Sequence, residues 1–452
     1  MQAATYNDQQ LRTLVVGLGA TGLSVARYLL AQGVRVAITD SREQPPGLEQ
    51  LQAEHPDLAV FLGSFDDAVF AQADLLVLSP GVPLATPQVR SAQARGVSVV
   101  GDIELFARAA RAPVVAITGS NGKSTVTTLV GEMAKACGRR VAVGGNLGTP
   151  ALDLLADDVE LYVLELSSFQ LETTRSLQAA VGTVLNVQAD HMDRYPDIET
   201  YAEAKSVVLQ GAGLGVYNAD DERVMGMSGS DDAWFFTLGC PQGDKSFGVR
   251  VLEGREWLCH GEQALLAAHE LRIPGRHNMA NALAALAIGT ALGFGLEQMC
   301  TVLRSFPGLP HRTEFVAETS GVRWYNDSKA TNVGATEAAL RGMHRADGGR
   351  AIVILGGDCK GGEFDQLTAA LAECARGVVL MGRDADQIRP SVPRACAVAQ
   401  AADMNEAVAR AAEMAETGDH VLLSPACASL DMFKNFAHRG DVFRNTVRRF
   451  LA

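Results

Sequence analysis

The sequence lacks an excess of basic residues and any paired-cysteine motif. Its 52 acidic residues outnumber 39 basic ones, giving a formal net charge of -13. General affinity for nucleic acid or for an anionic membrane is therefore not expected, because both normally need a basic surface. The eight cysteines include no C-x-x-C pair, which is typical of reduced thiols in a cytoplasmic protein and unlike a zinc knuckle.

Long apolar runs are also missing. The longest, residues 282–296, contains Thr290 and three glycines, and it is shorter than the roughly 20 residues that cross a bilayer. The first residues, MQAATYNDQQLR, do not place an apolar stretch after a basic one as a secretory signal does. We therefore expect a soluble, cytoplasmic protein without a membrane partner.

The composition is that of a globular chain, with 47% hydrophobic and 20% charged residues among 452. A single domain usually holds about 100 to 200 residues, so this length predicts two or three domains. Short apolar strands alternate with helical stretches, which favours an α/β fold with parallel sheets. We place a Rossmann-like N-terminal domain at 1–101, a central P-loop ATPase-type domain with a parallel sheet at 102–307, and a C-terminal Rossmann-like α/β domain at 308–452.

The individual elements are read from the same alternation. Strands are expected at 14–16, 34–40, 75–78, 114–117, 161–166, 183–187, 351–355 and 420–423, and a long helix at about 278–292.

The stretch TGSNGKST after the strand at 114–117 predicts a phosphate-binding loop. Backbone N–H groups and a helix N-terminus hold phosphates in such loops, with Lys123 near the β- and γ-phosphates and the Ser124 hydroxyl on magnesium. Ile117 stands where the longer G-x-x-x-x-G-K-[ST] form has its first glycine. The alternative is a glycine turn without a ligand. The residues predicted to bind ATP are Gly119, Ser120, Asn121, Gly122, Lys123, Ser124 and Thr125.

A second glycine turn, GLGATG at 17–22, fits a dinucleotide fingerprint, with Asp40 at the end of the next strand. A tight strand-to-helix turn without a ligand and NAD(P) binding by a dehydrogenase are both open readings. A second phosphate loop downstream indicates two separate nucleotide sites, and hydride transfer has no need of the second one.

Three further polar residues are candidates for metal binding or catalysis. Glu165 ends an apolar strand, where a carboxylate can hold a hard cation. His191 lies just after the strand at 183–187, and Lys205 lies on a polar helix. By spacing alone, a histidine such as His191 is more often an ordinary loop residue than a ligand, and Lys205 is by default a solvated helix lysine.

Taken together, these motifs resemble the Mur ligases, and among them the branch that adds D-glutamate. The matching stretches run through nearly the whole chain in order: ITGSNGKST, GGNLGTPAL, LELSSFQLE, NVQADHMDRYP, HNMANALAALA, GLPHRTE, NDSKATN and LLSPACASLDMFKNF. The resemblance implies an ATP-dependent ligase that joins D-glutamate to UDP-N-acetylmuramoyl-L-alanine through an acyl phosphate. ADP and phosphate are released, and the product is a precursor of bacterial peptidoglycan.

The resemblance also implies roles for individual residues. The UDP substrate is expected at Thr21, Asp40, Arg42 and Asn146, and D-glutamate at Lys360, Ser429 and Phe436. Asn281, Arg312 and Asp327 join the phosphate loop in binding ATP. Two magnesium ions are expected on Ser124, Glu165, His191 and a carbamate formed on Lys205, and the implied catalytic residues are Lys123, His191 and Lys205. The expected partners are these small molecules alone, and the expected state is a monomer.

Three alternatives stay open at this level. A folylpolyglutamate synthase shares the short phosphate loop, but it lacks a separate UDP domain such as the one that residues 17–22 begin. An ATP-dependent switch or scaffold would have no use for magnesium ligands and an amino-acid pocket. A dehydrogenase would bind NADH at the first glycine turn.

Overall fold

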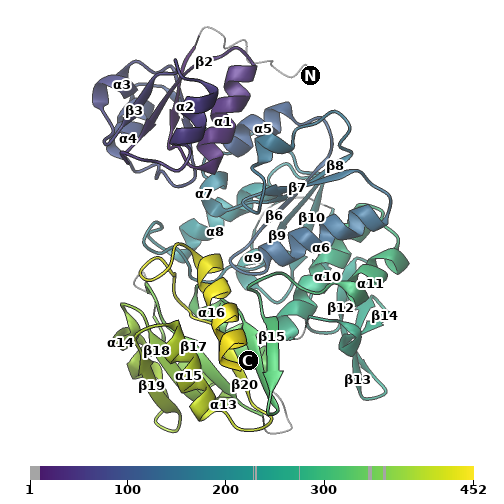
Figure 1. Cartoon of the computed structure of the whole chain (residues 1–452). Helices are drawn as coiled ribbons and strands as arrows, with labels where there is room; N and C mark the ends of the chain where they lie inside the picture. Colours follow the sequence, from purple (N-terminus) through teal and green to yellow (C-terminus); the bar gives the residue numbers. More distant parts are fainter. Residues whose placement is uncertain are drawn as a thin grey trace.

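The computed structural model describes residues 11–227, 229, 232–273, 275–344, 349–359 and 363–451. The chain folds into three α/β units, each built on its own sheet, which confirms the predicted fold class (Figure 1). The sheets span residues 12–101, 114–267 and 314–423, and we retain 1–101, 102–307 and 308–452 as proposed domain limits. In the described part of the chain, no helix is long and apolar enough to span a membrane.

The first sheet is entirely parallel, in the order β3-β2-β1-β4-β5. Its central strands are apolar on both faces because helices cover both, and Val15 and Val77 are fully buried. The elements are β1 (Arg12–Val16), α1 (Ala20–Ala31), β2 (Arg35–Asp40), α2 (Leu48–Glu54), β3 (Val60–Leu62), α3 (Asp67–Ala71), β4 (Leu75–Leu78), α4 (Pro87–Ala94) and β5 (Ser98–Gly101).

The second sheet has nine strands in the order β14-β13-β12-β11-β10-β9-β6-β8-β7. Its strands are β6 (Val114–Thr118), β7 (Val141–Gly145), β8 (Leu161–Glu165), β9 (Val181–Val184), β10 (Leu214–Asn218), β11 (Ala233–Phe236), β12 (Ser246–Leu252), β13 (Arg255–His260) and β14 (Gln263–Ala267). Its helices are α5 (Asp102–Ala109), α6 (Lys123–Ala136), α7 (Ser168–Leu171), α8 (Ile198–Ser206), α9 (Glu222–Met225), α10 (Arg276–Ala291) and α11 (Leu296–Ser305), with short 3-10 turns η1 (Ala151–Leu154), η2 (Val207–Leu209) and η3 (Ala268–Glu270).

The central sheet departs from the parallel one that the sequence predicted. Strands β12, β13 and β14 pair antiparallel at one edge. The turn between β12 and β13 is Glu253–Gly254, with φ of 51° and 76°, and two positive φ values are the geometry that closes a two-residue hairpin. Strand β9 also ends at Val184, three residues before the expected end.

The third sheet runs β15-β16-β20-β17-β18-β19 and is parallel except for its first strand. Its strands are β15 (Glu314–Thr319), β16 (Val322–Asn326), β17 (Ala351–Leu355), β18 (Ala375–Met381), β19 (Ala397–Ala401) and β20 (His420–Leu423). Its helices are α12 (Val333–Met343), α13 (Asp365–Cys374), α14 (Ala385–Ile388), η4 (Arg389–Ser391), α15 (Met404–Met414) and α16 (Phe436–Leu451).

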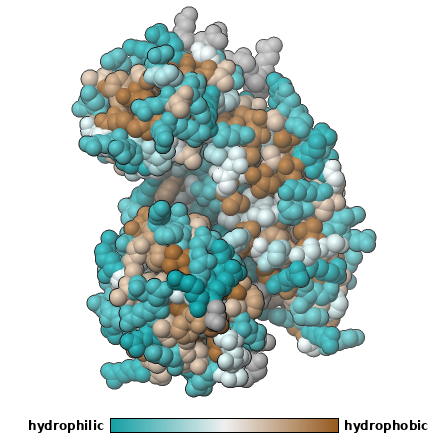
Figure 2. All heavy atoms as spheres, in the orientation of Figure 1, coloured by the Kyte–Doolittle hydropathy of each residue, from teal (hydrophilic) through white to brown (hydrophobic). Residues whose placement is uncertain are grey.

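The central unit contacts both of the others. The first unit packs above it and the third packs beside its lower half (Figure 1). Between the first and third units the surface is deeply hollowed (Figure 2). A hydrogen bond between the first and the central unit joins Ser24 Oγ to Asp153 Oδ1 at 2.6 Å. The phosphate loop follows β6, so it lies in the middle of the molecule.

Candidate active site

The phosphate loop connects β6 to α6 as the sequence predicted. Gly122 caps α6 at its N-terminus with φ of 84°, and a side chain there would collide with the Asn281 oxygen. Lys123 Nζ turns back over the loop and donates to the carbonyls of Gly119 at 2.7 Å and Ser120 at 2.9 Å. Burial lowers the pKa of Lys123, although nearby Glu165 opposes this shift. The loop is therefore shaped as an anion cradle with one buried cation.

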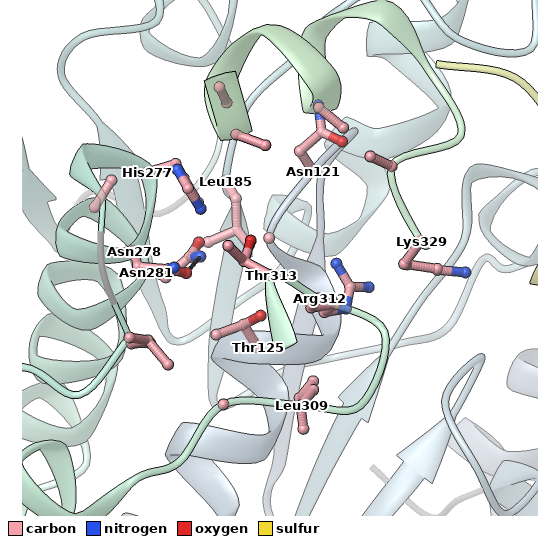
Figure 3. A pocket seen from close by; sticks show the side chains of 18 of the residues that line it. Asn121, Thr125, Leu185, His277, Asn278, Asn281, Leu309, Arg312, Thr313 and Lys329 are labelled. Atoms are coloured by element: carbon pink, nitrogen blue, oxygen red, sulfur yellow. Dashed lines mark hydrogen bonds between the residues drawn. The ribbon is translucent and has the colours of Figure 1, made fainter. Parts of the chain in front are cut away.

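A pocket opens beside this loop, between the central and third units (Figure 3). It encloses about 910 Å³ of space, including its part open to solvent. The structure brings together here six residues that the sequence assigned to ATP: Asn121, Gly122, Thr125, Asn281, Arg312 and Asp327. His277, Asn278 and Lys329 also line it, and these residues lie inside the stretches HNMANALAALA and NDSKATN.

Arg312 and Asp327 reach this pocket from the third unit. Arg312 Nη2 donates to Ser124 Oγ across the two units at 2.7 Å. Asp327 accepts from the Thr313 backbone N–H at 3.0 Å and the Ser424 hydroxyl at 2.8 Å, and burial raises its pKa to about 7. Lys329 Nζ lies 3.9 Å from the centre of the Phe436 ring.

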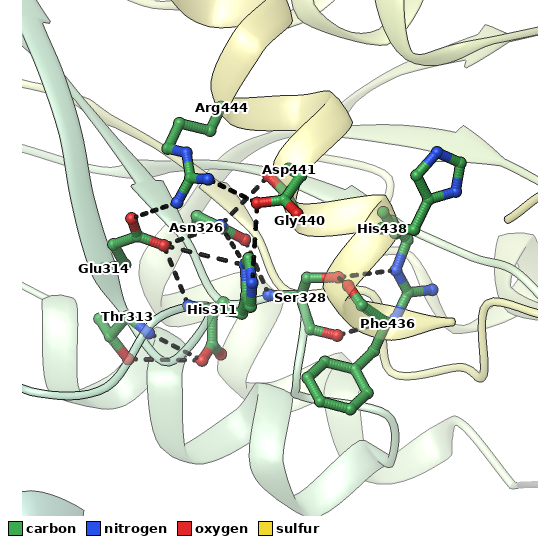
Figure 4. Close-up of polar contacts among 12 residues, drawn as sticks. His311, Thr313, Glu314, Asn326, Ser328, Phe436, His438, Gly440, Asp441 and Arg444 are labelled. Atoms are coloured by element: carbon green, nitrogen blue, oxygen red, sulfur yellow. Dashed lines mark hydrogen bonds and ion pairs between the residues drawn. The ribbon is translucent and has the colours of Figure 1, made fainter. Parts of the chain in front are cut away.

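The segment that carries Arg312 is fixed by a polar network (Figure 4). Glu314 is its centre, accepting from the His311 backbone N–H and the Asn326 side chain, both at 3.0 Å. Arg444 of α16 donates to the other Glu314 oxygen at 3.1 Å. Helix α16 and strand β16 together hold the base of the Arg312 loop.

Glu165 is the best-placed candidate for magnesium. It ends β8 and is 4% exposed, with one oxygen accepting from Asn146 Nδ2 at 2.8 Å. Its other oxygen, Oε2, is buried and has no hydrogen-bond partner within the described ranges. No three His, Cys, Asp or Glu side chains of the described residues gather into a metal cluster. Magnesium usually needs only one or two carboxylates beside substrate phosphates, so this donor set suits it.

Lys205, far from being a solvated residue, is 1% exposed. Its Nζ donates to the Gly119 carbonyl at 2.9 Å and lies 4.2 Å from the centre of the Tyr201 ring. Burial and the neighbouring Lys123 ammonium lower the pKa of Lys205 well below its usual value. This lowered pKa favours the neutral, nucleophilic amine over the ammonium.

His191 lies in the loop before α8 with φ of 59°. Its ring meets the Phe169 ring edge-on, with 4.8 Å between centres. The preceding Asp190 accepts from Asn332 Nδ2 of the third unit at 3.1 Å. Neither Asp190 nor Asn332 was singled out from the sequence, although both lie inside the stretches NVQADHMDRYP and NDSKATN.

In the first unit, Asp40 organises the glycine turn. Its carboxylate accepts from the Leu18 backbone N–H at 2.7 Å and from Arg42 Nε at 2.8 Å. Burial acts to raise the pKa of Asp40, but the bonds from Arg42 and Leu18 hold it below its usual value. Thr21 lies in the first turn of α1, which no side chain caps. Asn146 lies apart from this group, in the central unit beside Glu165.

The residues assigned to D-glutamate are partly described. Phe436 begins α16 beside Lys329. Ser429 is buried, and its carbonyl accepts from the Phe433 N–H at 2.8 Å. Lys360 lies outside the described residues.

Comparison with known proteins covers almost all of the chain. Three family models match in order: the Mur ligase MurD-like N-terminal domain at 11–101, the Mur ligase middle domain at 117–289, and the Mur ligase glutamate ligase domain at 311–427. The chain is 51% identical to the UDP-N-acetylmuramoylalanine–D-glutamate ligase of Nitrosococcus oceani over 97% of both chains. It is 52% identical to the enzyme of that name from Pseudomonas putida over 98% of both.

Solved structures share the fold at lower identity. UDP-N-acetylmuramate-alanine ligase from Thermotoga maritima superposes with a TM-score of 0.62 at 18% identity, over 98% of this chain and 99% of that one. A MurF ligase from the same organism, in complex with ADP, gives 0.58 at 17% identity, over 98% and 96%. The three-unit architecture is therefore shared over the full length.

Proposed function

The chain belongs to the Mur ligase family, and from that membership we propose that it joins D-glutamate to UDP-N-acetylmuramoyl-L-alanine at the expense of ATP. The observation that carries this proposal is identity of 51% to 52% to ligases named for this reaction, over 97% to 98% of the chain. Such coverage, including the first unit, sets aside the dehydrogenase, the scaffold and the folylpolyglutamate synthase. We place the enzyme in the cytoplasm, as a monomer, in the synthesis of peptidoglycan precursors.

The reaction needs carboxylate activation because hydroxide is a poor leaving group. The alanyl carboxylate attacks the γ-phosphorus of ATP, the bond from that phosphorus to the bridging oxygen breaks, and ADP leaves. The D-glutamate amine then attacks the acyl phosphate, and phosphate leaves as the amine proton is lost to solvent. Lys123 and Arg312 are the cations placed to offset the charge of the triphosphate and of the attacking carboxylate.

We assign two magnesium ions to donors of this site. Ser124 Oγ, the unpartnered oxygen of Glu165, His191 and Lys205 would hold them. When bound, magnesium supplies positive charge that reduces repulsion between the two anionic reactants. Lys205 would contribute as a carbamate: its neutral amine attacks CO2, one proton leaves to solvent, and an anionic oxygen ligand takes the place of an uncharged amine. The depressed pKa of Lys205 supports this step.

The remaining assignments concern the UDP substrate, the nucleoside of ATP and D-glutamate. We assign the UDP substrate to Thr21, Asp40 and Arg42, with Asn146 at the junction with Glu165. Asn281 and Asp327 would hold adenine and ribose, and Ser429, Phe436 and Lys360 would receive D-glutamate.

One assay tests the proposal. Phosphate release from ATP would be followed with UDP-N-acetylmuramoyl-L-alanine and each amino acid in both enantiomers. We expect release that depends on the UDP substrate and is supported by D-glutamate. Release with a different amino acid would overturn the specificity, and none with any amino acid would overturn the ligase assignment.

A further inference from the structure

One loop of the central unit is held from both outer units. This loop, residues 190–195, lies between β9 and α8 and contains His191. At one end, Asp190 accepts from Asn332 of the third unit at 3.1 Å. At the other, Arg194 Nη1 donates to the Pro80 carbonyl of the first unit at 2.7 Å. We propose that Arg194 and Asn332 are positioning residues that seat His191 only when both outer units are docked; this rests on the proposed function.

The backbone of the loop needs support from its surroundings. His191 adopts φ of 59°, a left-handed conformation that residues other than glycine rarely adopt. Its carbonyl accepts from the N–H groups of Arg194 at 2.9 Å and Tyr195 at 3.1 Å. The strained residue is thus held by the same turn that carries the Arg194 side chain.

Arg194 transmits its position to the imidazole through a neighbouring ring. Its guanidinium pairs with Glu172 at 2.7 Å, and these side chains are only 13% and 14% exposed. The same guanidinium lies 4.0 Å from the centre of the Phe169 ring, which in turn meets His191 edge-on at 4.8 Å. A planar guanidinium serves the carbonyl, the carboxylate and the ring face at once, which a lysine ammonium cannot do.

On the first unit, the residue that Arg194 contacts is connected to the glycine turn. Pro80 follows Ser79, whose hydroxyl donates to the Gly17 carbonyl at 2.8 Å. Gly17 begins the turn that we assign to the UDP substrate. A continuous set of contacts therefore joins that turn to the side chain of His191.

On the third unit, Asn332 joins a helix cap to the central unit. Its Oδ1 caps α12 by accepting from the Ala335 N–H at 2.9 Å, while its Nδ2 donates to Asp190 at 3.1 Å and, more weakly, to Asn121 of the phosphate loop at 3.4 Å. Replacement by aspartate keeps an N-cap oxygen but sets two carboxylates against each other. Asn332→Asp is thus a variant that weakens docking and preserves the helix.

The test is a double-mutant cycle of Arg194→Ala and Asn332→Asp, with Arg194→Lys as a second change at the first site. Two readouts are needed: kcat for the ligase reaction, and Mn²⁺ affinity in the presence of ADP, measured by electron paramagnetic resonance. Outer contacts of a metal ligand typically contribute 10- to 100-fold, so we expect each single variant to lose about that factor in both readouts. Arg194→Lys should resemble Arg194→Ala.

The double variant shows whether Arg194 and Asn332 act together on His191 or act independently. If both residues act through His191, the double variant loses much less than the product of the single losses. Losses that multiply, or wild-type Mn²⁺ affinity in Arg194→Ala, would overturn the proposal. The control is Arg175→Ala, an exposed arginine that donates to the adjacent Thr174 carbonyl. Mn²⁺ binding needs neither UDP substrate nor D-glutamate, so this result stands apart from the substrate assignment.

Discussion

Lys205 shows how a single residue depends on its surroundings. It is buried beside a second lysine, and the side-chain nitrogens of both donate to the same Gly119 carbonyl. Nothing in the spacing YAEAK distinguishes it from a surface lysine. Its importance becomes visible only in the fold, because burial and a like charge are tertiary properties.

We expect Lys205→Ala to lose at least about 100-fold in kcat, because it removes an anionic metal ligand. A short carboxylic acid such as acetate at high concentration should restore part of the rate by supplying that oxygen. Initial rates with and without acetate measure both effects. Lys135→Ala, which changes an exposed lysine of α6, is the control. Full activity of Lys205→Ala without acetate would remove Lys205 from the site.

Other residues of the site also differ in whether a local sequence pattern or only the fold reveals their position. The position of Lys123 and Ser124 at the start of α6 was predictable, because it follows from a local strand–loop–helix spacing. Asp190 and Asn332 were not, because they lie 142 positions apart and no local pattern pairs them.

At the scale of elements, the start of α6 is tightly constrained. Gly122 combines a left-handed φ with contact against Asn281. Gly122→Ala should therefore raise the KM for ATP at least about 10-fold, beyond a stability loss of about 1 kcal/mol from the φ alone.

The other end of the same helix supplies the control for this prediction. Gly138 has φ of 78°, and no atom lies within 4 Å of an added Cβ. Gly138→Ala should show the loss of stability without the change in KM. Equal KM values for both variants would show that contact with Asn281 is unimportant.

Helix α5, which joins the first and central units, begins with a buried carboxyl. Asp102 accepts from Gln170 Nε2 at 2.9 Å, and burial raises its pKa to about 6. The folded state therefore holds this proton more tightly than the unfolded chain, so its contribution is present below about pH 4 and is lost as pH rises through 6.

It follows that Asp102→Asn should be more stable than wild type at pH 7.5, by on the order of 1 to 3 kcal/mol, with no such gain near pH 4. Thermal melting at the two pH values measures the difference. Asp157→Asn, which changes a carboxyl that is 94% exposed, should show no such pH-dependent gain. A gain of equal size at both pH values would contradict the assigned titration.

Eight strands and one long helix were predicted from apolar alternation, and β1, β6, β17 and α10 are among the elements that correspond to them. The antiparallel edge formed by β12, β13 and β14 was not singled out. Its signal was the two-residue Glu253–Gly254 turn, which does not itself reveal that the hairpin extends a parallel sheet.

At the scale of the whole molecule, contact between the third unit and the phosphate loop was expected only from the resemblance, which placed Arg312 and Asp327 at ATP. It rests on side chains from separate units, such as Arg312 on Ser124 at 2.7 Å. A triphosphate at the phosphate loop would attract the same guanidinium, so nucleotide should favour the docked arrangement.

Small-angle scattering checks this expectation. The radius of gyration should fall when ATP and UDP-N-acetylmuramoyl-L-alanine are added together, and it should fall less for Arg312→Ala. The same curves for wild type with and without both ligands would argue against closure.

The carbonyl shared by Lys123 and Lys205 has one further consequence. On the proposed chemistry, the Lys205 amine of an enzyme without bicarbonate stays hydrogen-bonded to the Gly119 carbonyl. Such an enzyme is folded but inactive. Reaction of Lys205 with CO2 would remove one of the two donors to the Gly119 carbonyl. The same reaction would create the carbamate oxygen that binds magnesium. The concentration of bicarbonate would then determine the fraction of enzyme that is active. This would be seen as a lag before the steady rate of reaction, and the lag would shorten as the bicarbonate concentration is raised.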